Sequence, residues 1–401
     1  MTRWLTIVGM GEDLAEGLSI AARRAIESAE VVIGSQRMFA MLPSLKAEKH
    51  LWPQPFSLVV EQVKGFASRR TVLLATGDPM NFGVARKILD FIPKVEVEII
   101  PHLSAFSLAT AQMGWSIPDC DCFTIHGRPA ANLEAFIQPG ANLLVLTQDE
   151  TSVAEACHRL IARGFEKSHI AVLENLGGPN ERITHFIANE NPDLEWSPLN
   201  TLAIHCIASA TAKIYSRIGG LPDNAFVHDG QLTKREVRAT TLAALAPAPD
   251  ELLWDVGAGC GSIAIEWMRS TRGCEAIAIE HNANRCAMIA RNADQLGTPR
   301  LKLVQGEAPA ALTGLPSPHA IFIGGGVGIA GVFENCWQAL GSGGRLVANV
   351  VTLEGEMHLY DLQEKHGGEL LRIEISRLEP VGKFRALKPK MPVVQWRVTK
   401  P

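Results

Sequence analysis

The sequence predicts an α/β protein of two unlike domains with mainly parallel sheets. The 401 residues exceed the usual size of a single domain. Short apolar runs alternate with helix-like segments along the chain, as in parallel strands joined by helices. A polar, small-residue stretch at 208–220 interrupts this alternation, and the glycine-rich segments on its two sides differ. We therefore expect domains at 1–206 and 221–401, joined by a linker at 207–220.

The elements expected in the first domain follow from its apolar runs. Strands are expected at 5–8, 31–33, 72–75, 95–100, 143–146, 170–173 and 202–206. Helix-like patterns lie between them, and the clearest are at 19–28 and 152–163.

The second domain shows the same alternation. Its expected strands are at 252–254, 276–279, 301–305, 320–323, 345–351, 370–376 and 393–398. Helices are expected at 234–245, 262–268, 283–296 and 329–340. This count predicts a doubly wound, seven-stranded sheet.

Composition argues against several classes of protein. Hydrophobic residues make up 47% and charged residues 20% of the chain, which is an ordinary globular balance. The net charge is −4 and there is no long basic run, so nucleic acid is not an expected partner. No apolar run approaches the ~18 residues of a membrane span, and residues 1–4 lead straight into a strand. We expect no membrane segment, no signal peptide and a cytoplasmic protein.

The eight cysteines and twelve histidines are dispersed along the chain. No C-x-x-C pair occurs, and Cys120 and Cys122 are too close together for a usual zinc knuckle. We therefore expect free thiols in a reducing compartment and no metal.

The most informative segment runs from Asp255 to Glu266. An apolar strand, the loop Gly257-Ala258-Gly259-Cys260-Gly261 and a helix follow one another. Alternating glycines let a ligand approach the backbone, and a helix N-terminus favours a carboxylate or phosphate. Glu280 ends the next apolar run, where a carboxylate can accept hydrogen bonds from both ribose hydroxyls of an adenosine ligand.

The glycine spacing and Asp255 indicate which adenosine ligand binds. A dinucleotide fingerprint has the pattern G-x-G-x-x-G, whereas this loop has G-x-G-x-G. Asp255 would repel a pyrophosphate but suits a cationic amino group, such as the methionine end of S-adenosyl-L-methionine. We expect that cofactor, with NAD and an ordinary tight turn as the alternatives.

Further motifs continue this pattern, at 221–223, 233–238, 306–309, 323–326 and 341–345. Together with the loop, they resemble the class I, Rossmann-like methyltransferases of the cobalamin pathway. The resemblance implies that Thr233 lies close to S-adenosyl-L-methionine, that residues 257–261 wrap its methionine part and that Glu280 holds its ribose. It also implies that Glu307 and Ala308 border the adenine. An alternative for Thr233 is the N-cap of the helix at 234–245.

The first half carries different motifs, which follow its strands. In their order over 1–206 they resemble the tetrapyrrole methylases, two-lobed class III enzymes that hold S-adenosyl-L-methionine between their lobes. The resemblance implies that the cofactor is bound by Gly9, Gly11, Gly77, Asp78, Pro79 and Ser104. Two positions depart from that family: Glu12-Asp13 replaces a frequent Pro-Gly-Asp, and His102 replaces a glycine.

One chain with both modules resembles the fused methyltransferases that act on precorrin-6Y in cobalamin (vitamin B12) biosynthesis. The resemblance implies methylation at C5 by the first domain. It implies methylation at C15 and decarboxylation of the ring C acetate by the second, giving precorrin-8X. Three alternatives stay open: a cobalt-containing substrate, an RNA or protein methyltransferase with a degenerate first domain, and a ligand-sensing module without turnover. We also expect a homo-oligomer.

A tetrapyrrole substrate carries several carboxylates, which arginine binds through two parallel hydrogen bonds. Arg235 and Arg238 lie three residues apart on one face of the expected helix. A second basic group, opposed only by Glu379, consists of Arg377, Lys383, Arg385, Lys388 and Lys390. In the first domain, His126 and Arg128 are candidates for carboxylate contact or proton transfer, whereas His102 is expected to be structural. No proton donor for decarboxylation is predicted.

Overall fold

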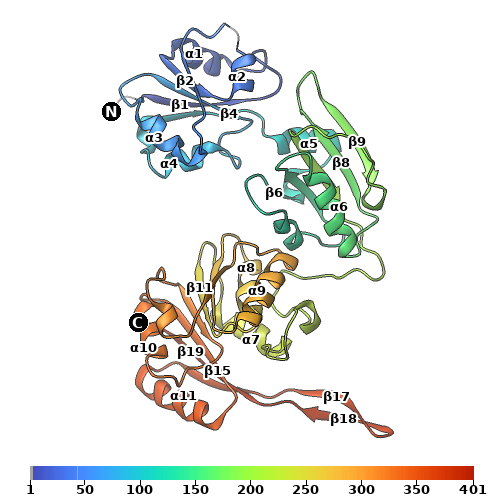
Figure 1. Cartoon of the computed structure of the whole chain (residues 1–401), viewed down its shortest axis with the longest axis vertical. Coiled ribbons are helices and arrows are strands. Elements are labelled where there is room, and N and C mark those ends of the chain that lie inside the picture. The colour runs from blue at the N-terminus through green and yellow to red at the C-terminus, as the bar shows by residue number, and fades with distance from the viewer. Residues whose placement is uncertain (1–2, 43) are drawn as a thin grey trace. The chain divides into compact units, whose positions relative to one another are not determined.

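The computed structural model describes residues 3–42 and 44–401 (Figure 1). The chain divides into two compact units. The first comprises residues up to Ala130 together with Pro139–Lys213, and the second comprises Ala131–Gln138 together with Ile214–Pro401. The division at 213–214 lies within the stretch 207–220. The grouping of residues 131–138 with the second unit has no signal in the sequence pattern.

The first sheet of the first unit is fully parallel, with the order β3-β2-β4-β1-β5. Its strands are β1 (Leu5–Met10), β2 (Val31–Gly34), β3 (Glu48–Leu51), β4 (Thr71–Thr76) and β5 (Val97–Ile100). Apolar residues of α1 (Ile20–Ser28) and α2 (Gln36–Ala40) pack on one face of this sheet. Those of α3 (Val59–Lys64) and α4 (Val84–Leu89) pack on the other (Figure 1).

The second sheet of the first unit is mixed, so the expectation of mainly parallel sheets is wrong here. Its order is β6-β7-β10-β8-β9, and only β6 and β7 are parallel. The strands are β6 (Cys120–Thr124), β7 (Asn142–Leu146), β8 (His169–Glu174), β9 (Arg182–Ile187) and β10 (Asn200–His205). No α-helix of the described chain joins β8 to β9 or β9 to β10, and parallel pairing requires such a crossover. The helices α5 (Ala105–Met113) and α6 (Ser152–Ala162) belong to this half of the unit.

The second unit contains the predicted seven-stranded sheet, with the order β13-β12-β11-β14-β15-β19-β16. The strands are β11 (Leu252–Val256), β12 (Glu275–Glu280), β13 (Lys302–Gln305), β14 (Ala320–Ile323), β15 (Arg345–Val350), β16 (Glu369–Ile373) and β19 (Val393–Thr399). The first five are parallel, whereas β19 is antiparallel to both of its neighbours. From β11 the chain adds β12 and β13 on one side and then returns to add β14 and β15 on the other, so the strand order changes direction between β11 and β14. Open α/β sheets bind ligands at such a point.

Helices cover both faces of this sheet, so the prediction of a doubly wound fold is confirmed. One face packs against α7 (Arg235–Leu245), α8 (Ser262–Ser270) and α9 (Ala283–Gln295). The other packs against α10 (Val332–Ala339) and α11 (Leu353–His366), and its core includes Trp254 and Trp396. Among the described residues, no helix is long and apolar enough to cross a bilayer.

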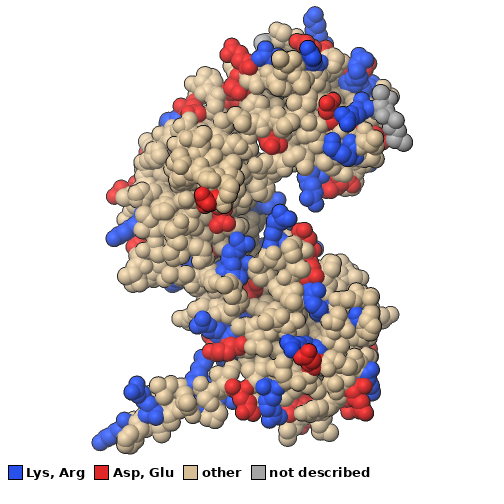
Figure 2. All heavy atoms as spheres, turned by 180° about the vertical axis from the view of Figure 1, so that it is seen from behind, with Lys and Arg blue, Asp and Glu red and all other residues tan. Residues whose placement is uncertain are grey.

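A two-stranded hairpin between β16 and β19 was not predicted. Its strands are β17 (Ser376–Val381) and β18 (Phe384–Pro389), and it extends away from the seven-stranded sheet (Figure 1). Lys and Arg side chains follow the hairpin, whereas acidic and basic side chains are interspersed over the rest of the face in Figure 2. The basic group predicted near the C-terminus therefore lies on this hairpin and, with Lys390, just beyond it.

Candidate functional site

A cavity of about 1380 Å³ lies in the second unit, at the carboxyl ends of β11, β12, β14 and β15. A site for one small molecule commonly has about 300–1,000 Å³, so this volume accommodates a cofactor together with part of a substrate. Most of the residues predicted to bind the cofactor line it: Thr233, Gly257, Ala258, Gly259, Cys260, Glu280, Glu307 and Ala308. Gly261 is not among the described lining residues.

The glycine loop adopts a conformation that side chains oppose. Gly257, Gly259 and Gly261 have φ values of +72°, +60° and +80°. A Cβ on Gly257 would lie 3.3 Å from the backbone nitrogen of Gly325, so two glycine segments approach each other at the cavity wall. Gly261 instead packs against Ile289 and precedes the first residue of α8, so its function is to start the helix.

Glu280 has two backbone partners and also faces the cavity. Its Oε2 accepts a hydrogen bond from Gly259 N at 2.9 Å, and its Oε1 accepts one from Asn282 N at 2.9 Å. The side chain is only 2% exposed. Oε1 also lies 3.3 Å from His281 Nδ1. Oε2 keeps a further lone pair, so the site retains an acceptor for a ribose hydroxyl while Glu280 holds the glycine loop.

Asp255 lies behind the loop instead of in the cavity wall. Its Oδ2 accepts a hydrogen bond from Ala264 N at 3.0 Å in the first turn of α8, while its Oδ1 is buried without a partner. Burial raises the pKa of Asp255 to about 7, and the charge of Glu280 adds to the rise. The structure corrects the expectation that Asp255 faces a cationic ligand group. The side chain has a structural position beneath the loop.

Residues 227–234, which we call the strap, cross the glycine loop. A Cβ placed on Gly259 would lie 3.4 Å from the backbone oxygen of Gln231. Thr233 lines the cavity within this segment, as the resemblance implies. The alternative that Thr233 caps α7 is wrong, because Lys234 is the N-cap residue, and the first N–H of the helix, at Arg235, donates to Asp223 Oδ1 at 2.9 Å. Cys260 lies in the loop beneath the strap, and burial raises the pKa of its thiol to about 11.

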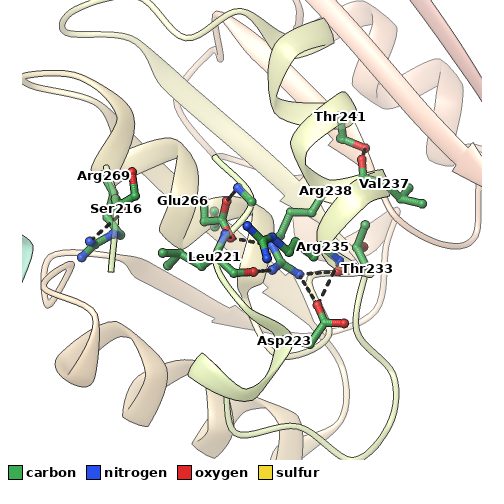
Figure 3. A network of polar contacts seen from close by, with 12 residues as sticks. Ser216, Leu221, Asp223, Thr233, Arg235, Val237, Arg238, Thr241, Glu266 and Arg269 are labelled. Carbon is green, nitrogen blue, oxygen red and sulfur yellow. Dashed lines mark hydrogen bonds and ion pairs between the residues drawn. The ribbon is translucent and has the colours of Figure 1, made fainter. Parts of the chain in front are cut away.

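Arg238 is not available to a substrate, which corrects the expectation that it faces one. Its side chain is 0% exposed and its guanidinium forms hydrogen bonds with four groups (Figure 3). These groups are the carboxylates of Glu266 and Asp223 and the backbone oxygens of Leu221 and Thr233. Arg235 is exposed and lies outside the cavity lining among the described residues. Helical spacing alone could not separate a buried arginine from an exposed one.

Two of the predicted basic side chains line the cavity, Arg377 on β17 and Lys390 just beyond β18. Arg377 forms an ion pair with Glu236 at 2.7 Å, which lowers the pKa of that glutamate. Lys383, Arg385 and Lys388 lie outside the described lining.

Lys234 also lines the cavity, and it forms no ion pair with any described residue. Sequence reasoning passed over Lys234, although it stands beside Arg235 in the same motif. It likewise missed Asn349 of β15 and Glu354 and His358 of α11, which line the cavity.

In the first unit, three predicted segments meet at the carboxyl ends of β1, β4 and β5. Gly77 N donates to Met10 O at 2.7 Å, and a Cβ on Gly9 would lie 2.4 Å from Gly77 O. A Cβ on Gly77 would lie 3.5 Å from Leu103 O. Gly11, Asp78, Pro79 and Ser104 belong to these same segments. Ser104 caps α5, and its Oγ accepts from Ser107 N at 3.1 Å.

The residues that depart from the family pattern lie together. His102 Nε2 is 3.5 Å from Asp13 Oδ2, and its Cε1 would be 2.7 Å from a Cβ on Gly11. Glu12 forms an ion pair with Arg37. His102 and Asp13 thus fill space beside Gly11, and this contact favours the structural interpretation of His102.

His126 and Arg128 are exposed on the loop that follows β6. The Arg128 guanidinium lies 5.8 Å from the centre of the Phe82 ring, in the loop that follows Gly77-Asp78-Pro79. Phe82 in turn meets Phe106 edge to face, at 5.9 Å between ring centres. The predicted pair therefore lies near the second of the three segments.

The described residues contain no group of three or more His, Cys, Asp or Glu side chains placed to hold a metal ion. All eight cysteines have free thiols. Burial raises the pKa of several of them, including Cys157 and Cys274 to about 11.

Two family models match the chain. Residues 4–190 match the tetrapyrrole (corrin/porphyrin) methylases, and residues 224–400 match a precorrin methyltransferase domain. The precorrin-6Y C(5,15)-methyltransferase (decarboxylating) of a Sinorhizobium species is 45% identical over 398 residues, 99% of this chain and 96% of the relative. The protein of the same name from Mycobacterium tuberculosis is 37% identical over 400 residues, 99% of this chain and 100% of the relative.

A solved structure is also similar to part of the chain. It is the crystal structure of the C-terminal domain of precorrin-6Y C5,15-methyltransferase from Rhodobacter capsulatus, with 49% sequence identity and a TM-score of 0.44. The match covers 46% of this chain and 100% of that one. Both modules and their order agree with relatives that match over nearly the full length. The chain therefore belongs to the precorrin-6Y C5,15-methyltransferase (decarboxylating) family.

Proposed function

We propose that the chain uses S-adenosyl-L-methionine to methylate precorrin-6Y at C5 and C15. It also removes the carboxyl group of the ring C acetate, so that the product is precorrin-8X. Its full-length relatives carry this activity in their names. When bound, the cofactor supplies an electrophilic methyl group, and the protein must mainly align that group with a ring carbon.

The observation that carries the proposal is the cavity of the second unit. Its glycine loop has φ values that favour glycine, and an acidic side chain follows at the end of β12. Residues 257–260 then surround the methionine part of the cofactor, Glu280 accepts from the ribose, and Glu307 and Ala308 border the adenine. Thr233 lies beside the cofactor on the strap.

The first unit binds a second cofactor molecule in this proposal. The segments that contain Gly9 and Gly11, Gly77-Asp78-Pro79, and Ser104 supply that site, and their convergence supports it. This unit methylates C5, and His126 and Arg128 are its candidate contacts for a carboxylate of the ring. The second unit methylates C15 and performs the decarboxylation.

Substrate carboxylates in the second unit meet Lys234, Arg377 and Lys390. All three line the cavity, and Lys234 has no acidic partner among the described residues that would compete for its charge. Ammonium and guanidinium groups in a partly dry cavity favour carboxylates strongly. Lys234 therefore replaces Arg235 and Arg238 as the first candidate.

The test uses the full chain with one site disabled at a time. Gly77 and Gly259 both have a φ of +60°, and a Cβ at either position would meet no atom closer than 3.4 Å. At S-adenosyl-L-methionine concentrations well below the raised Kd of the altered site, Gly259→Ala should leave mainly a product with the C5 methyl group alone. Under the same condition, Gly77→Ala should leave mainly one that is decarboxylated and methylated at C15. Mass spectrometry of products from precorrin-6Y, and in parallel from its cobalt-containing counterpart, separates these outcomes. Normal C15 methylation by Gly259→Ala would refute the assignment.

We also propose a homo-oligomer. The hairpin exposes apolar side chains that a second copy could cover: Leu378, Val381, Phe384, Leu387 and, just beyond it, Met391. Analytical ultracentrifugation of the full chain tests this, and a monomer at micromolar concentration would contradict it.

A further inference from the structure

The strap lies over the glycine loop and lines the cavity with most of its length. Gly230, Gln231, Leu232, Thr233 and Lys234 are all lining residues. The strap has no regular secondary structure, so hydrogen bonds and ion pairs from elsewhere in the unit must hold it. Its position determines the shape of the wall opposite the glycine loop.

Two contacts hold the amino end of the strap. The buried side chain of Asn292 bonds to both backbone groups of Val227, and also to Cys260 O at 2.9 Å in the glycine loop. Arg285 forms an ion pair with Asp229 at 2.8 Å. Both contacts come from α9, so the amino end of the strap is fixed to the same helix that packs behind the loop.

One side chain holds the carboxyl end. Arg238 Nη1 donates to Thr233 O at 2.5 Å, and its Nη2 donates to Leu221 O (Figure 3). Its Nε donates at 2.5 Å to Glu266, which lies on the helix that the glycine loop begins. The guanidinium of Arg238 therefore connects three segments: the strap, the backbone at Leu221 and helix α8.

We propose that Arg238 is a positioning residue for the cofactor site of the second unit. It fixes the carboxyl end of the strap, so that Thr233 and Lys234 stand in place over the glycine loop before a ligand arrives. The inference rests on the proposed function, because that function puts the cofactor beneath the strap.

The planar guanidinium is essential to this arrangement. It presents five donors in a fixed geometry, whereas an ammonium group is a single point with a shorter reach. Arg238→Lys keeps the charge beside Glu266 but cannot donate to Leu221, Thr233 and Glu266 at once. A loosened strap must become ordered each time a ligand binds, so the cost falls on binding. At saturating cofactor the reaction itself should change little.

The test compares Arg238→Lys with Arg269→Lys, in full-length protein that also carries Gly77→Ala to silence the first site. Arg269 is a matched control. It is buried, lies in the same unit and donates to the backbone oxygens of Tyr215, Ser216 and Leu296, none of which belongs to the strap. Arg238→Lys should raise the KM for S-adenosyl-L-methionine about tenfold or more, the effect of losing a hydrogen bond from a charged donor, with kcat within about twofold. Arg269→Lys should leave that KM unchanged.

Hydrogen exchange of strap amides without ligand gives a second readout. Exchange at residues 230–234 should quicken in Arg238→Lys and stay as it is in Arg269→Lys. The double variant Arg238→Met/Glu266→Gln removes the buried charge pair while leaving an acceptor for Leu221 N, so it should show the same raised KM if it folds. An unchanged KM together with unchanged strap exchange would overturn the inference and leave the proposed function intact. If the Gly77→Ala protein binds no S-adenosyl-L-methionine at all, the second unit is not a cofactor site. That result would refute the proposed function, and with it the inference that depends on it.

Discussion

A methyl group added at Gly259 gives a quantitative test of the glycine loop. Gly259 has a φ of +60°, and the nearest atom to a new Cβ is Gln231 O at 3.4 Å. The left-handed conformation costs an alanine about 1–2 kcal/mol relative to glycine. Because the contact with Gln231 is an ordinary van der Waals distance, Gly259→Ala should destabilise the second unit by no more than this.

Cofactor affinity should fall further, because the methyl group occupies space at the cavity wall. Overpacking a close-fitting site costs about 1–3 kcal/mol, which corresponds to a rise in Kd of about 5- to 150-fold. Isothermal titration of the full chain measures this at the second site while the first site serves as an internal reference. Gly314→Ala is the matched control, because Gly314 has a φ of +77° and open space around its Cβ. The reasoning fails if Gly259→Ala keeps wild-type affinity at both sites, or if Gly314→Ala weakens binding equally.

Substitutions at three further positions test the same unit. Glu280→Ala leaves the backbone N–H groups of Gly259 and Asn282 without their acceptor. Thermal unfolding should show that the free energy of unfolding falls by about 1–3 kcal/mol for each N–H group left unpaired. Glu280→Gln keeps one acceptor oxygen, so its free energy of unfolding should fall less than that of Glu280→Ala. An equal fall in the two variants would contradict this account. Burial raises the pKa of Asp255 to about 7, so the folded state retains a proton that the unfolded state releases near pH 4. Stability should therefore fall as the pH rises from 4 to 7, by up to about 1.4 kcal/mol per unit, and melting curves of Asp255→Asn should show a shallower decline. Lys234→Ala should raise the KM for the tetrapyrrole and spare cofactor affinity, and an unaltered tetrapyrrole KM would exclude its proposed contact.

The parts of the fold that could be predicted depend on short stretches of chain. The strand before Asp255, the glycine loop and α8 are consecutive, and Glu280 follows at the end of the next strand. Parallel strands then bring these segments to one edge of the sheet without further information. In the first unit, the resemblance to the tetrapyrrole methylases indicated the segments of Gly9, Gly77 and Ser104, and the structure brings them together.

The parts that could not be predicted depend on pairing between distant segments. Arg238 is buried because its acceptors come from positions 221, 223, 233 and 266, and no local pattern records that convergence. The hairpin was missed because Pro380 and Pro389 interrupt its strands, and proline usually argues against a strand. The mixed sheet of the first unit escaped prediction because apolar runs do not record strand direction.

The grouping of residues 131–138 with the second unit has a consequence for protein synthesis. Ala135 lies against Gly297, and Gln138 donates to Tyr215 O at 2.6 Å. On the ribosome, residues 131–138 emerge well before either partner, while the remainder of the first unit is complete at residue 213. The first unit is therefore complete while Ala135 and Gln138 still lack their contacts in the second unit, so the segment that contains them is exposed until that unit is made. A gene cut at the boundary between the units would make that temporary exposure permanent, so the two halves should be less soluble apart than together.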